Sequence, residues 1–469
     1  MSCQPTQANS DSGADPMPYE ATWKSLDTRP CPEWFQQEKI GLMVCWGLYS
    51  VPSWKQLEAR RYGSYAEWYY ARVMDNAENG GKAFHEKNFG KDFDYHDFLP
   101  LFRAELWDPG FWAKTFKRSG ARYVVLTAKY HDGYCLWPTK VPHNKNYHSM
   151  STGPKRDLLG DLSKAVRAEG LRMGVYYSIP DWESVPSNPG EYAIAERHAK
   201  KHGVDLKTYV EEVYKVHLKE LVTGYKPSVI FSDAGEWFYD DEFWGTRDFL
   251  AWLYNESPVK DEIVVNDRFF KGMQGKHGDY YSSEYADAEV VDHPWEESRG
   301  MGGSYGYNRA ENLDDYQSSG ELIEEMIDVV GRGGNFLLNV GPTADGCIPV
   351  IQQQRLADIG AWLEVNGDAI YGTSAYKGAV KAVNQPDATI TFTVKRDDLY
   401  VICNAWPQTE LLLSGLQEDV THTVQLLGWD PMLVARQAGD RLDIEVPSLS
   451  PAQIPCHHAW VFRISPKKK

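Results

Sequence analysis

The sequence lacks the features that would mark several large classes of protein. No apolar run approaches the ~20 residues of a membrane-spanning helix. Asp and Glu number 66 against 49 Lys and Arg, a formal net charge of −17, so no excess of cations is available for nucleic-acid phosphates. The seven cysteines show neither CxxC spacing nor a histidine pattern, which argues against a metal cluster and a disulfide framework. We therefore expect no nucleic-acid partner, membrane span, metal or cofactor.

A signal peptide of the usual form is also missing. Met1-Ser2-Cys3-Gln4 precedes a polar stretch over residues 5–15, with no charged start and no apolar core. A bacterial lipoprotein trimmed at its lipid-bearing cysteine would begin in this way, and so would a cytoplasmic protein with a flexible start. The sequence predicts a flexible leader over residues 1–30. Export to the periplasm or lipid anchoring at Cys3 is the first interpretation, and a cytoplasmic location is the alternative.

A repeated unit of apolar strand and amphipathic helix is present instead. The 469 residues exceed one ordinary single-core domain. Buried strands are predicted at 40–46, 123–128, 171–178, 228–233, 263–266 and 335–340. Apolar strands that alternate with helices are typical of a parallel sheet covered by helices. We expect an α/β fold, with a (β/α)8-like TIM barrel over residues 31–370.

The doubly wound sheet is the rival fold, and the end of the first strand argues against it. That fold usually shows a glycine-rich phosphate turn there, whereas this chain has Trp46-Gly47-Leu48-Tyr49. After Gly372 the pattern changes to period two, with turns such as Arg396-Asp397-Asp398 between the runs. Residues 371–469 are therefore predicted to form a C-terminal antiparallel β-sandwich.

Polar residues that close the barrel strands are the candidates for chemistry, because active sites of such barrels lie at the carboxyl ends of strands. Asp233 ends an apolar run and precedes the small residues Ala234 and Gly235. A carboxylate there could serve as the nucleophile of a retaining glycosidase, which places two carboxyl groups ~5 Å apart around the scissile bond. The alternative interpretation is a helix cap. The 17 Trp and 28 Tyr also suit sugar stacking, although core packing explains them equally well.

The second carboxyl group has three candidates. Glu284 follows the aromatic pair Tyr280-Tyr281, and Glu296 and Glu297 follow Trp295 in a predicted loop. Burial against an aromatic ring could raise the pKa of any of them into the range of a general acid, whereas a plain surface glutamate is the alternative.

Four further residues have two interpretations each. His131, beside Asp132, could donate a hydrogen bond to a sugar hydroxyl or brace a loop. Arg268 could hold a ring oxygen or pair with a carboxylate. Glu67 and Trp68 could contact sugar hydroxyls or belong to an ordinary helix.

These motifs resemble glycoside hydrolase family 29, the α-L-fucosidases, over about residues 34–373. The matching segments include KIGLMVCWGLYSVP at 39–52, LTAKYHDGY at 126–134, FSD at 231–233, VVNDR at 264–268 and GRGGNFLLNVGPTADG at 331–346. The resemblance implies a metal-free retaining exo-α-L-glycosidase acting on carbohydrate, with a catalytic barrel followed by a β-sandwich. It implies Asp233 as nucleophile and Glu284 as general acid/base, with Glu296 as the fallback. The substrate-binding positions that it implies are Cys45, Trp46, Glu67, Trp68, Tyr130, His131, Tyr177, Phe231 and Arg268.

The chain departs from the family at three of these positions. Cys45 and Tyr130 stand where histidines are usual, and Phe231 stands where tryptophan is frequent. Loss of two histidines that hold sugar hydroxyls would cost on the order of several kcal/mol in the discrimination between fucose and related sugars. Terminal α-L-fucoside is the default substrate, α-L-glucoside and α-L-galactoside are the alternatives, and a non-catalytic L-sugar-binding protein is the remote one. The sequence sets neither the oligomeric state nor the role of the sandwich.

Overall fold

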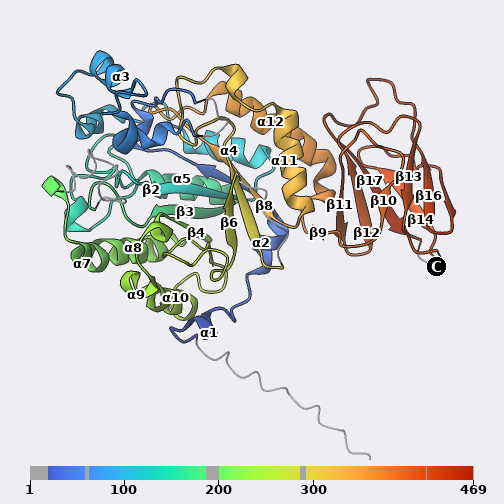
Figure 1. Ribbon diagram of the computed structural model, residues 1–469, viewed down its shortest axis with the longest axis horizontal. Helices are drawn as coiled ribbons and strands as arrows, with labels where there is room; N and C mark the ends of the chain where they lie inside the picture. The colour runs from blue at the N-terminus through green and yellow to red at the C-terminus, as the bar shows by residue number, and fades with distance from the viewer. Residues whose placement is uncertain (1–18, 59–62, 186–199, 286–291, 419, 468–469) are drawn as a thin grey trace, which may run out of the picture.

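The computed structural model describes residues 19–58, 63–185, 200–285, 292–418 and 420–467 (Figure 1). Cys3 and the first 18 residues of the expected leader lie outside the described residues. Within them, no helix is long and apolar enough to cross a membrane.

An eight-stranded parallel sheet forms the larger domain, in the order β5-β4-β3-β2-β1-β8-β7-β6. Every strand except the pair β5 and β6 is hydrogen-bonded to its neighbour in sequence, and β1 pairs with β8, as in a (β/α)8 barrel. The predicted TIM-barrel-like fold is therefore confirmed. The strands are β1 (Ile40–Val44), β2 (Tyr123–Lys129), β3 (Arg172–Ser178), β4 (Val229–Asp233), β5 (Val264–Val265), β6 (Tyr281–Glu284), β7 (Trp295–Arg299) and β8 (Asn335–Val340).

Helices cover the outer face of this sheet, and their ends carry the expected caps. Asp108 accepts hydrogen bonds from the backbone N–H of Gly110 and Phe111 at the start of α4, and Ser318 forms a capping box with Glu321 at the start of α11. The helices are α1 (Trp23–Leu26), α2 (Glu33–Glu38), α3 (Gly81–Asn88), α4 (Pro109–Arg118), α5 (Leu158–Ala168), α7 (Leu206–Thr208), α8 (Lys215–Tyr225), α9 (Asp241–Trp244), α10 (Thr246–Asn255), α11 (Ser319–Gly331) and α12 (Val350–Asn366).

Two apolar layers lie on either side of the barrel strands. The barrel interior contains Met43, Val125, Tyr176 and Phe231, whereas a larger layer packs between the strands and the helices. Because successive side chains of a strand point to opposite faces, neighbouring residues of one strand belong to different layers. This alternation decides which strand-end residues can reach the barrel mouth.

The barrel has a seam between β5 and β6. These strands share no ladder in the described part of the chain, and no described helix lies between them. Asp279 bridges the seam, because its backbone N–H donates to the Val265 carbonyl (3.0 Å) and its Oδ2 accepts from the Val265 N–H (2.8 Å). A side chain therefore replaces part of the missing backbone pairing.

Residues 19–30, which the sequence places in a flexible leader, pack against the barrel instead. Trp23 donates from its indole nitrogen to Asp241 (2.8 Å), and Arg29 forms an ion pair with Asp279 (2.6 Å). Both partners of this ion pair are buried, with side chains 6% and 3% exposed. A buried carboxylate needs such a partner, so Arg29 ties this segment to the barrel seam.

A β-sandwich of two antiparallel sheets forms the smaller domain. One sheet has the order β10-β13-β16-β15 and the other β14-β17-β12-β11-β9. Helices α11 and α12 lie between the barrel sheet and the sandwich (Figure 1), and Trp362 of α12 donates to the Ala459 carbonyl (2.9 Å). The strands are β9 (Ser374–Ala375), β10 (Lys381–Ala382), β11 (Ile390–Lys395), β12 (Asp398–Cys403), β13 (Glu410–Ser414), β14 (His422–Leu426), β15 (Ala435–Ala438), β16 (Arg441–Glu445) and β17 (Trp460–Pro466).

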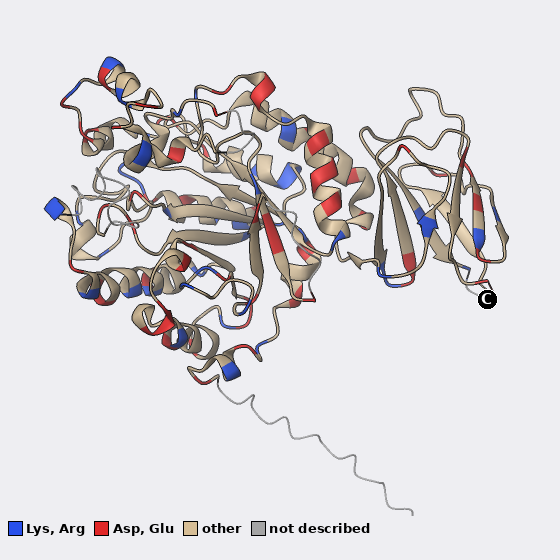
Figure 2. Cartoon of the chain, viewed as in Figure 1, with Lys and Arg blue, Asp and Glu red and all other residues tan. Residues whose placement is uncertain are grey.

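Charged residues of both signs are spread over the outer helices and the sandwich (Figure 2). Helix α11 carries acidic residues between its apolar ones, as the sequence SGELIEEMIDVVG shows. Acidic and basic residues are equal in number over residues 371–469, so the acidic excess lies in residues 1–370.

Candidate active site

A cavity of about 610 Å³ lies at the carboxyl ends of the barrel strands. Its wall combines carboxyl groups, one guanidinium, one imidazole and aromatic rings, a set suited to a neutral, hydroxyl-rich ligand. The lining residues are Tyr65, Glu67, Trp68, Tyr130, His131, Asp233, Glu236, Trp237, Arg268, Gln274, Glu284, Tyr285 and Tyr305.

Asp233 is the last residue of β4 and is held on three sides. Its Oδ2 accepts from the Tyr176 hydroxyl (2.5 Å), and its Oδ1 accepts from the Ala234 N–H (2.9 Å) and from Arg268 Nη1 (3.2 Å). Burial would raise the pKa of Asp233, but the charge of Arg268 and the Tyr176 hydrogen bond outweigh it, and its pKa lies below the ordinary value. This carboxylate is thus ionised and fixed in direction.

The backbone after Asp233 makes a tight turn that brings further residues to the cavity. Ala234 has φ 63°, in the left-handed region. A Cβ on Gly235 would lie 2.4 Å from the Phe269 carbonyl oxygen, so only glycine fits there. The turn carries Glu236 and Trp237 into the cavity wall.

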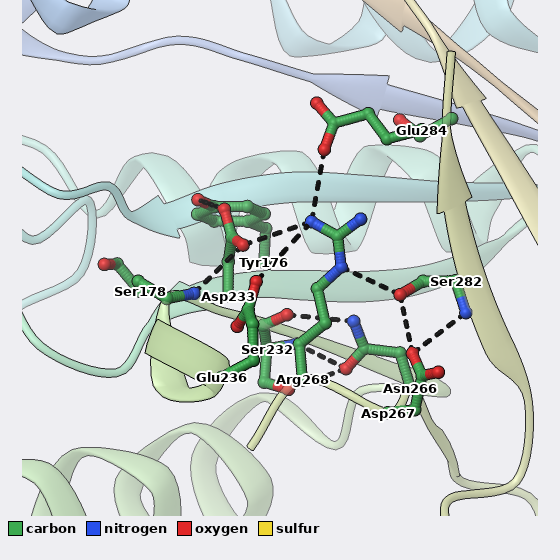
Figure 3. Close-up of polar contacts among 12 residues, drawn as sticks. Tyr176, Ser178, Ser232, Asp233, Glu236, Asn266, Asp267, Arg268, Ser282 and Glu284 are labelled. Carbon is green, nitrogen blue, oxygen red and sulfur yellow. Dashed lines mark hydrogen bonds and ion pairs between the residues drawn. The ribbon is translucent and has the colours of Figure 1, made fainter. Parts of the chain in front are cut away.

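Arg268 is oriented by polar side chains that span three strands (Figure 3). Asn266 accepts from the Ser232 N–H (2.9 Å), which ties the segment after β5 to β4. Asp267 accepts from the Ser282 N–H (2.9 Å), which ties it to β6. Ser282 in turn accepts from Arg268 Nε (2.8 Å). The segment 266–268 therefore fixes the guanidinium across the region where the strand ladder is missing.

Glu284, the last residue of β6, meets the same guanidinium. Its Oε2 lies 3.2 Å from Arg268 Nη1, the nitrogen that also lies 3.2 Å from Asp233 Oδ1 (Figure 3). The two carboxylate oxygens are thus separated by at most twice that distance. This upper bound lies between the roughly 5–5.5 Å of retaining glycosidases and the roughly 6.5–9.5 Å of inverting ones. The shared guanidinium therefore places the two carboxyl groups on one face of the cavity, within the reach of one glycosidic bond.

His131 lies 3.6 Å from Asp233 through its Nε2. The Ser178 hydroxyl donates to the Pro180 carbonyl (2.5 Å), so it must accept from His131 Nδ1 (2.6 Å). Burial lowers the pKa of His131 to about 4, so the ring is neutral and Nε2 carries no proton. His131 therefore presents an acceptor to the cavity, whereas the sequence analysis expects a donor.

Glu67, Trp68 and Tyr130 also line the cavity, as their predicted roles require. Glu67 accepts from the Ser304 hydroxyl (2.8 Å) and the Gly306 N–H (3.0 Å), and burial raises its pKa to about 7. The Trp68 ring lies 5.4 Å from the ring of His131. These residues provide a polar group and apolar faces next to Asp233.

Tyr177 and Trp46 are the predicted binding residues that point away from the cavity. Tyr177 bonds His217 Nδ1 (3.0 Å) in the layer between strands and helices, whereas Tyr176, its neighbour on β3, faces the barrel interior. Trp46 donates to the Thr343 carbonyl (2.8 Å) in the same outer layer. The sequence could not separate the two faces, because both sides of these strands are apolar.

Cys45 and Phe231 lie in the barrel interior behind the cavity wall. Cys45 Sγ is 3.2 Å from the Tyr49 hydroxyl, and the Tyr49 ring packs edge-on against Tyr130 at 5.0 Å. Phe231 stacks on Tyr176 at 5.7 Å. Both residues therefore reach the cavity through a tyrosine.

Glu296 lies at the opposite end of the barrel. It belongs to strand β7 rather than to the predicted loop, and it pairs with Asn335, the first residue of β8. Its Oε2 accepts from the hydroxyl of Tyr123, the first residue of β2. Burial raises the pKa of Glu296 to about 8, so this neutral acid is a core group. The geometry does not bring it to Asp233, because its side chain lies at the amino ends of the strands.

Several residues of the site are absent from the predicted binding set. Tyr176 is the most informative, because it bonds Asp233 directly from the barrel interior. Ser178 of β3 lies opposite Asp233 of β4 in the sheet. Tyr176 lies two residues before Ser178 and so points to the same face of the sheet, which could have indicated its contact with Asp233. Glu236 had only its closeness to Asp233 as a signal. The other unpredicted lining residues are Tyr65, Trp237, Gln274, Tyr285 and Tyr305.

Comparisons with known proteins agree with this geometry. The family described as "Alpha-L-fucosidase" matches residues 6–368, and "Alpha-L-fucosidase C-terminal domain" matches residues 384–465. The alpha-L-fucosidase of Branchiostoma floridae is 38% identical over 95% of both chains, and the tissue alpha-L-fucosidase of Bos taurus is 37% identical over 96% of this chain and 92% of that one.

A solved structure shows the same overall arrangement. The crystal structure of Thermotoga maritima alpha-fucosidase in complex with a mechanism-based inhibitor is 37% identical, with a TM-score of 0.82, and the match covers 95% of this chain and 100% of that one. With both domains matched in order and relatives aligned over nearly the whole length, the chain belongs to the α-L-fucosidase family of glycoside hydrolases.

Proposed function

We propose that this protein removes terminal α-L-fucosyl residues from carbohydrates with net retention, with Asp233 as nucleophile and Glu284 as general acid/base. The observation that carries the proposal is the shared contact of both carboxylates with Arg268 Nη1, at the mouth of a barrel whose relatives are named fucosidases. A retaining mechanism needs two carboxyl groups on either side of one glycosidic bond, and these two lie at the same guanidinium.

In the first step, an Asp233 oxygen attacks C1 of the bound fucosyl unit. Glu284, entering this step protonated, gives its proton to the glycosidic oxygen, the C1–O bond breaks, and a fucosyl ester of Asp233 forms. In the second step, Glu284 as a carboxylate takes a proton from water, the water oxygen bonds to C1, and the ester bond breaks. Two inversions at C1 return the α configuration.

The surroundings of the two carboxyl groups suit these different tasks. The Asp233 side chain is 15% exposed and has three hydrogen bonds, as a positioned nucleophile requires. The Glu284 side chain is 35% exposed, so a leaving group and then a water molecule can reach it. Arg268 steadies Asp233, and His131 Nε2 can accept a hydrogen bond from a sugar hydroxyl.

A panel of 4-nitrophenyl α-L-glycosides tests the proposed activity. We expect the α-L-fucoside to be hydrolysed with a higher kcat/KM than the α-L-glucoside and α-L-galactoside, because the relatives over the whole chain are fucosidases. Proton NMR of the first product should show the α anomer before mutarotation. Preference for another glycone, or initial release of the β anomer, would contradict the proposal.

The proposal gives Tyr130 and Cys45 a joint part in sugar binding. Tyr130 lines the cavity beside His131, and Cys45 supports it from behind through Tyr49. Cys45 and Tyr130, the two residues that replace the usual histidines, are thus connected through the ring of Tyr49. The same panel measured on Tyr130→His tests this role in sugar binding. We expect the variant to prefer the α-L-fucoside over the other glycosides more strongly than the wild type does, through a change in KM.

Tyr176→Phe is expected to move the acid limb of the kcat/KM profile to higher pH. The variant removes a hydrogen bond that favours ionised Asp233, so the pKa of Asp233 rises and the attacking carboxylate is lost at a less acid pH. At the optimum, kcat/KM should fall roughly tenfold. Tyr177→Phe is the matched control, because its hydroxyl bonds His217 on the outer face. An unmoved acid limb in Tyr176→Phe would contradict the assigned contact.

A further inference from the structure

Glu236 is a third carboxyl group in the cavity, and the mechanism above does not use it. It lines the cavity with Asp233 and Glu284, three residues after the proposed nucleophile. Its side chain is 10% exposed. A carboxyl group placed so deep, beside two others, requires an explanation, because burial without a partner is unfavourable.

The protein leaves one oxygen of this side chain without a hydrogen bond. Oε2 is buried and has no partner among the described residues. Oε1 lies 4.0 Å from Arg268 Nη1, beyond hydrogen-bond distance. The same Nη1 contacts Asp233 and Glu284 at 3.2 Å, so the guanidinium is engaged by the two other carboxylates.

Glu236 lies in the same part of the cavity as the proposed nucleophile. The side chain approaches the same guanidinium nitrogen that contacts the nucleophile, and it rises from the turn directly after Asp233. Arg268, Asp233 and Glu284 are the charged groups that face it. Burial first, and then the charge of Asp233, raise the pKa of Glu236 well above its ordinary value, which favours the neutral acid, the form with an O–H to donate.

We propose that Glu236 is a substrate-binding residue whose carboxylic acid donates a hydrogen bond to a hydroxyl of the fucosyl unit. The inference rests on the proposed function, because it takes the fucosyl unit as the occupant of the cavity. The substrate hydroxyl supplies the acceptor that the protein does not provide. Loss of the proton removes the donor and adds a negative charge beside Asp233, so sugar binding weakens as pH rises.

The test combines turnover with binding of free L-fucose by calorimetry. Glu236→Ala should raise KM for 4-nitrophenyl α-L-fucoside and for a fucosyl disaccharide by about tenfold each, and weaken L-fucose binding by a similar factor, with a smaller change in kcat. Glu236→Gln keeps a neutral hydrogen-bond donor of the same size, so KM should rise, and L-fucose affinity should fall, by only about threefold. Wild-type binding should weaken at alkaline pH, and this dependence should be absent in Glu236→Gln.

Glu242→Ala, at an exposed glutamate of α9, is the matched control. An unchanged L-fucose affinity in Glu236→Ala would overturn the inference, as would a Gln variant as impaired as the Ala variant or a loss confined to the disaccharide. A wild-type protein that binds L-fucose without hydrolysing fucosides would refute the proposed function instead, and the binding arm would still decide the role of Glu236.

Discussion

Asp233→Ala is expected to lower kcat for 4-nitrophenyl α-L-fucoside on the order of 10⁴-fold, because it removes the atom that bonds to C1. The loss should appear in kcat and not only in KM, since Arg268 and His131 remain to bind the sugar. Steady-state kinetics on purified protein measure it. Asp261→Ala, at an exposed aspartate before β5, is a matched control that should retain wild-type kinetics.

Azide should restore part of the activity of Asp233→Ala. The small anion fits the space that the carboxylate leaves and attacks C1 from the same face, so the product is β-L-fucosyl azide after a single inversion. Hydrolysis by Asp233→Ala at more than about a tenth of the wild-type rate would contradict the nucleophile assignment, as would the α azide.

Glu284→Ala is expected to slow hydrolysis most for substrates whose leaving group needs a proton. For a fucosyl disaccharide, whose leaving oxygen needs a proton, kcat/KM should fall about 10²- to 10⁴-fold. For 2,4-dinitrophenyl α-L-fucoside, which leaves without a proton, the first step should change little. Azide should then attack the fucosyl ester of Asp233 and give α-L-fucosyl azide, the opposite anomer from that of Asp233→Ala.

Glu296→Gln is the matched control for the acid/base test. Glu296 is already neutral in the core, and glutamine has the same shape, so kcat/KM for the disaccharide should stay within about threefold of wild type. If Glu296→Gln instead showed the dependence on leaving group and Glu284→Ala did not, the two assignments would have to be exchanged.

The strands of the barrel were largely predictable because burial on both faces leaves an unbroken apolar run. The run predicted at 335–340 coincides with β8, and that at 228–233 differs from β4 by one residue. Strand β7 has the sequence WEESR, in which buried Glu296 accepts from Tyr123 of β2 and buried Glu297 pairs with Arg299 of the same strand. No local pattern distinguishes such a strand from a loop, so Glu296 was expected in a loop.

The site was predictable in its chemistry but only partly in its geometry. Asp233, Glu284, Arg268 and His131 meet in one cavity, as strand-end positions and the family resemblance indicated. Tyr177 was chosen over Tyr176 because one residue of register separates the cavity from the outer layer. The donor or acceptor state of His131 depends on Ser178, a contact that sequence spacing does not reveal.

The central claim, a covalent fucosyl ester on Asp233, is tested most directly by trapping it. Incubation with 2-deoxy-2-fluoro-L-fucosyl fluoride should slow hydrolysis of the ester more than its formation. Intact-mass spectrometry should then show one added 2-fluorofucosyl group, and peptide mapping should place it on the peptide that contains Asp233. An adduct on a different carboxyl group, or turnover that releases the β anomer without any adduct, would contradict the account.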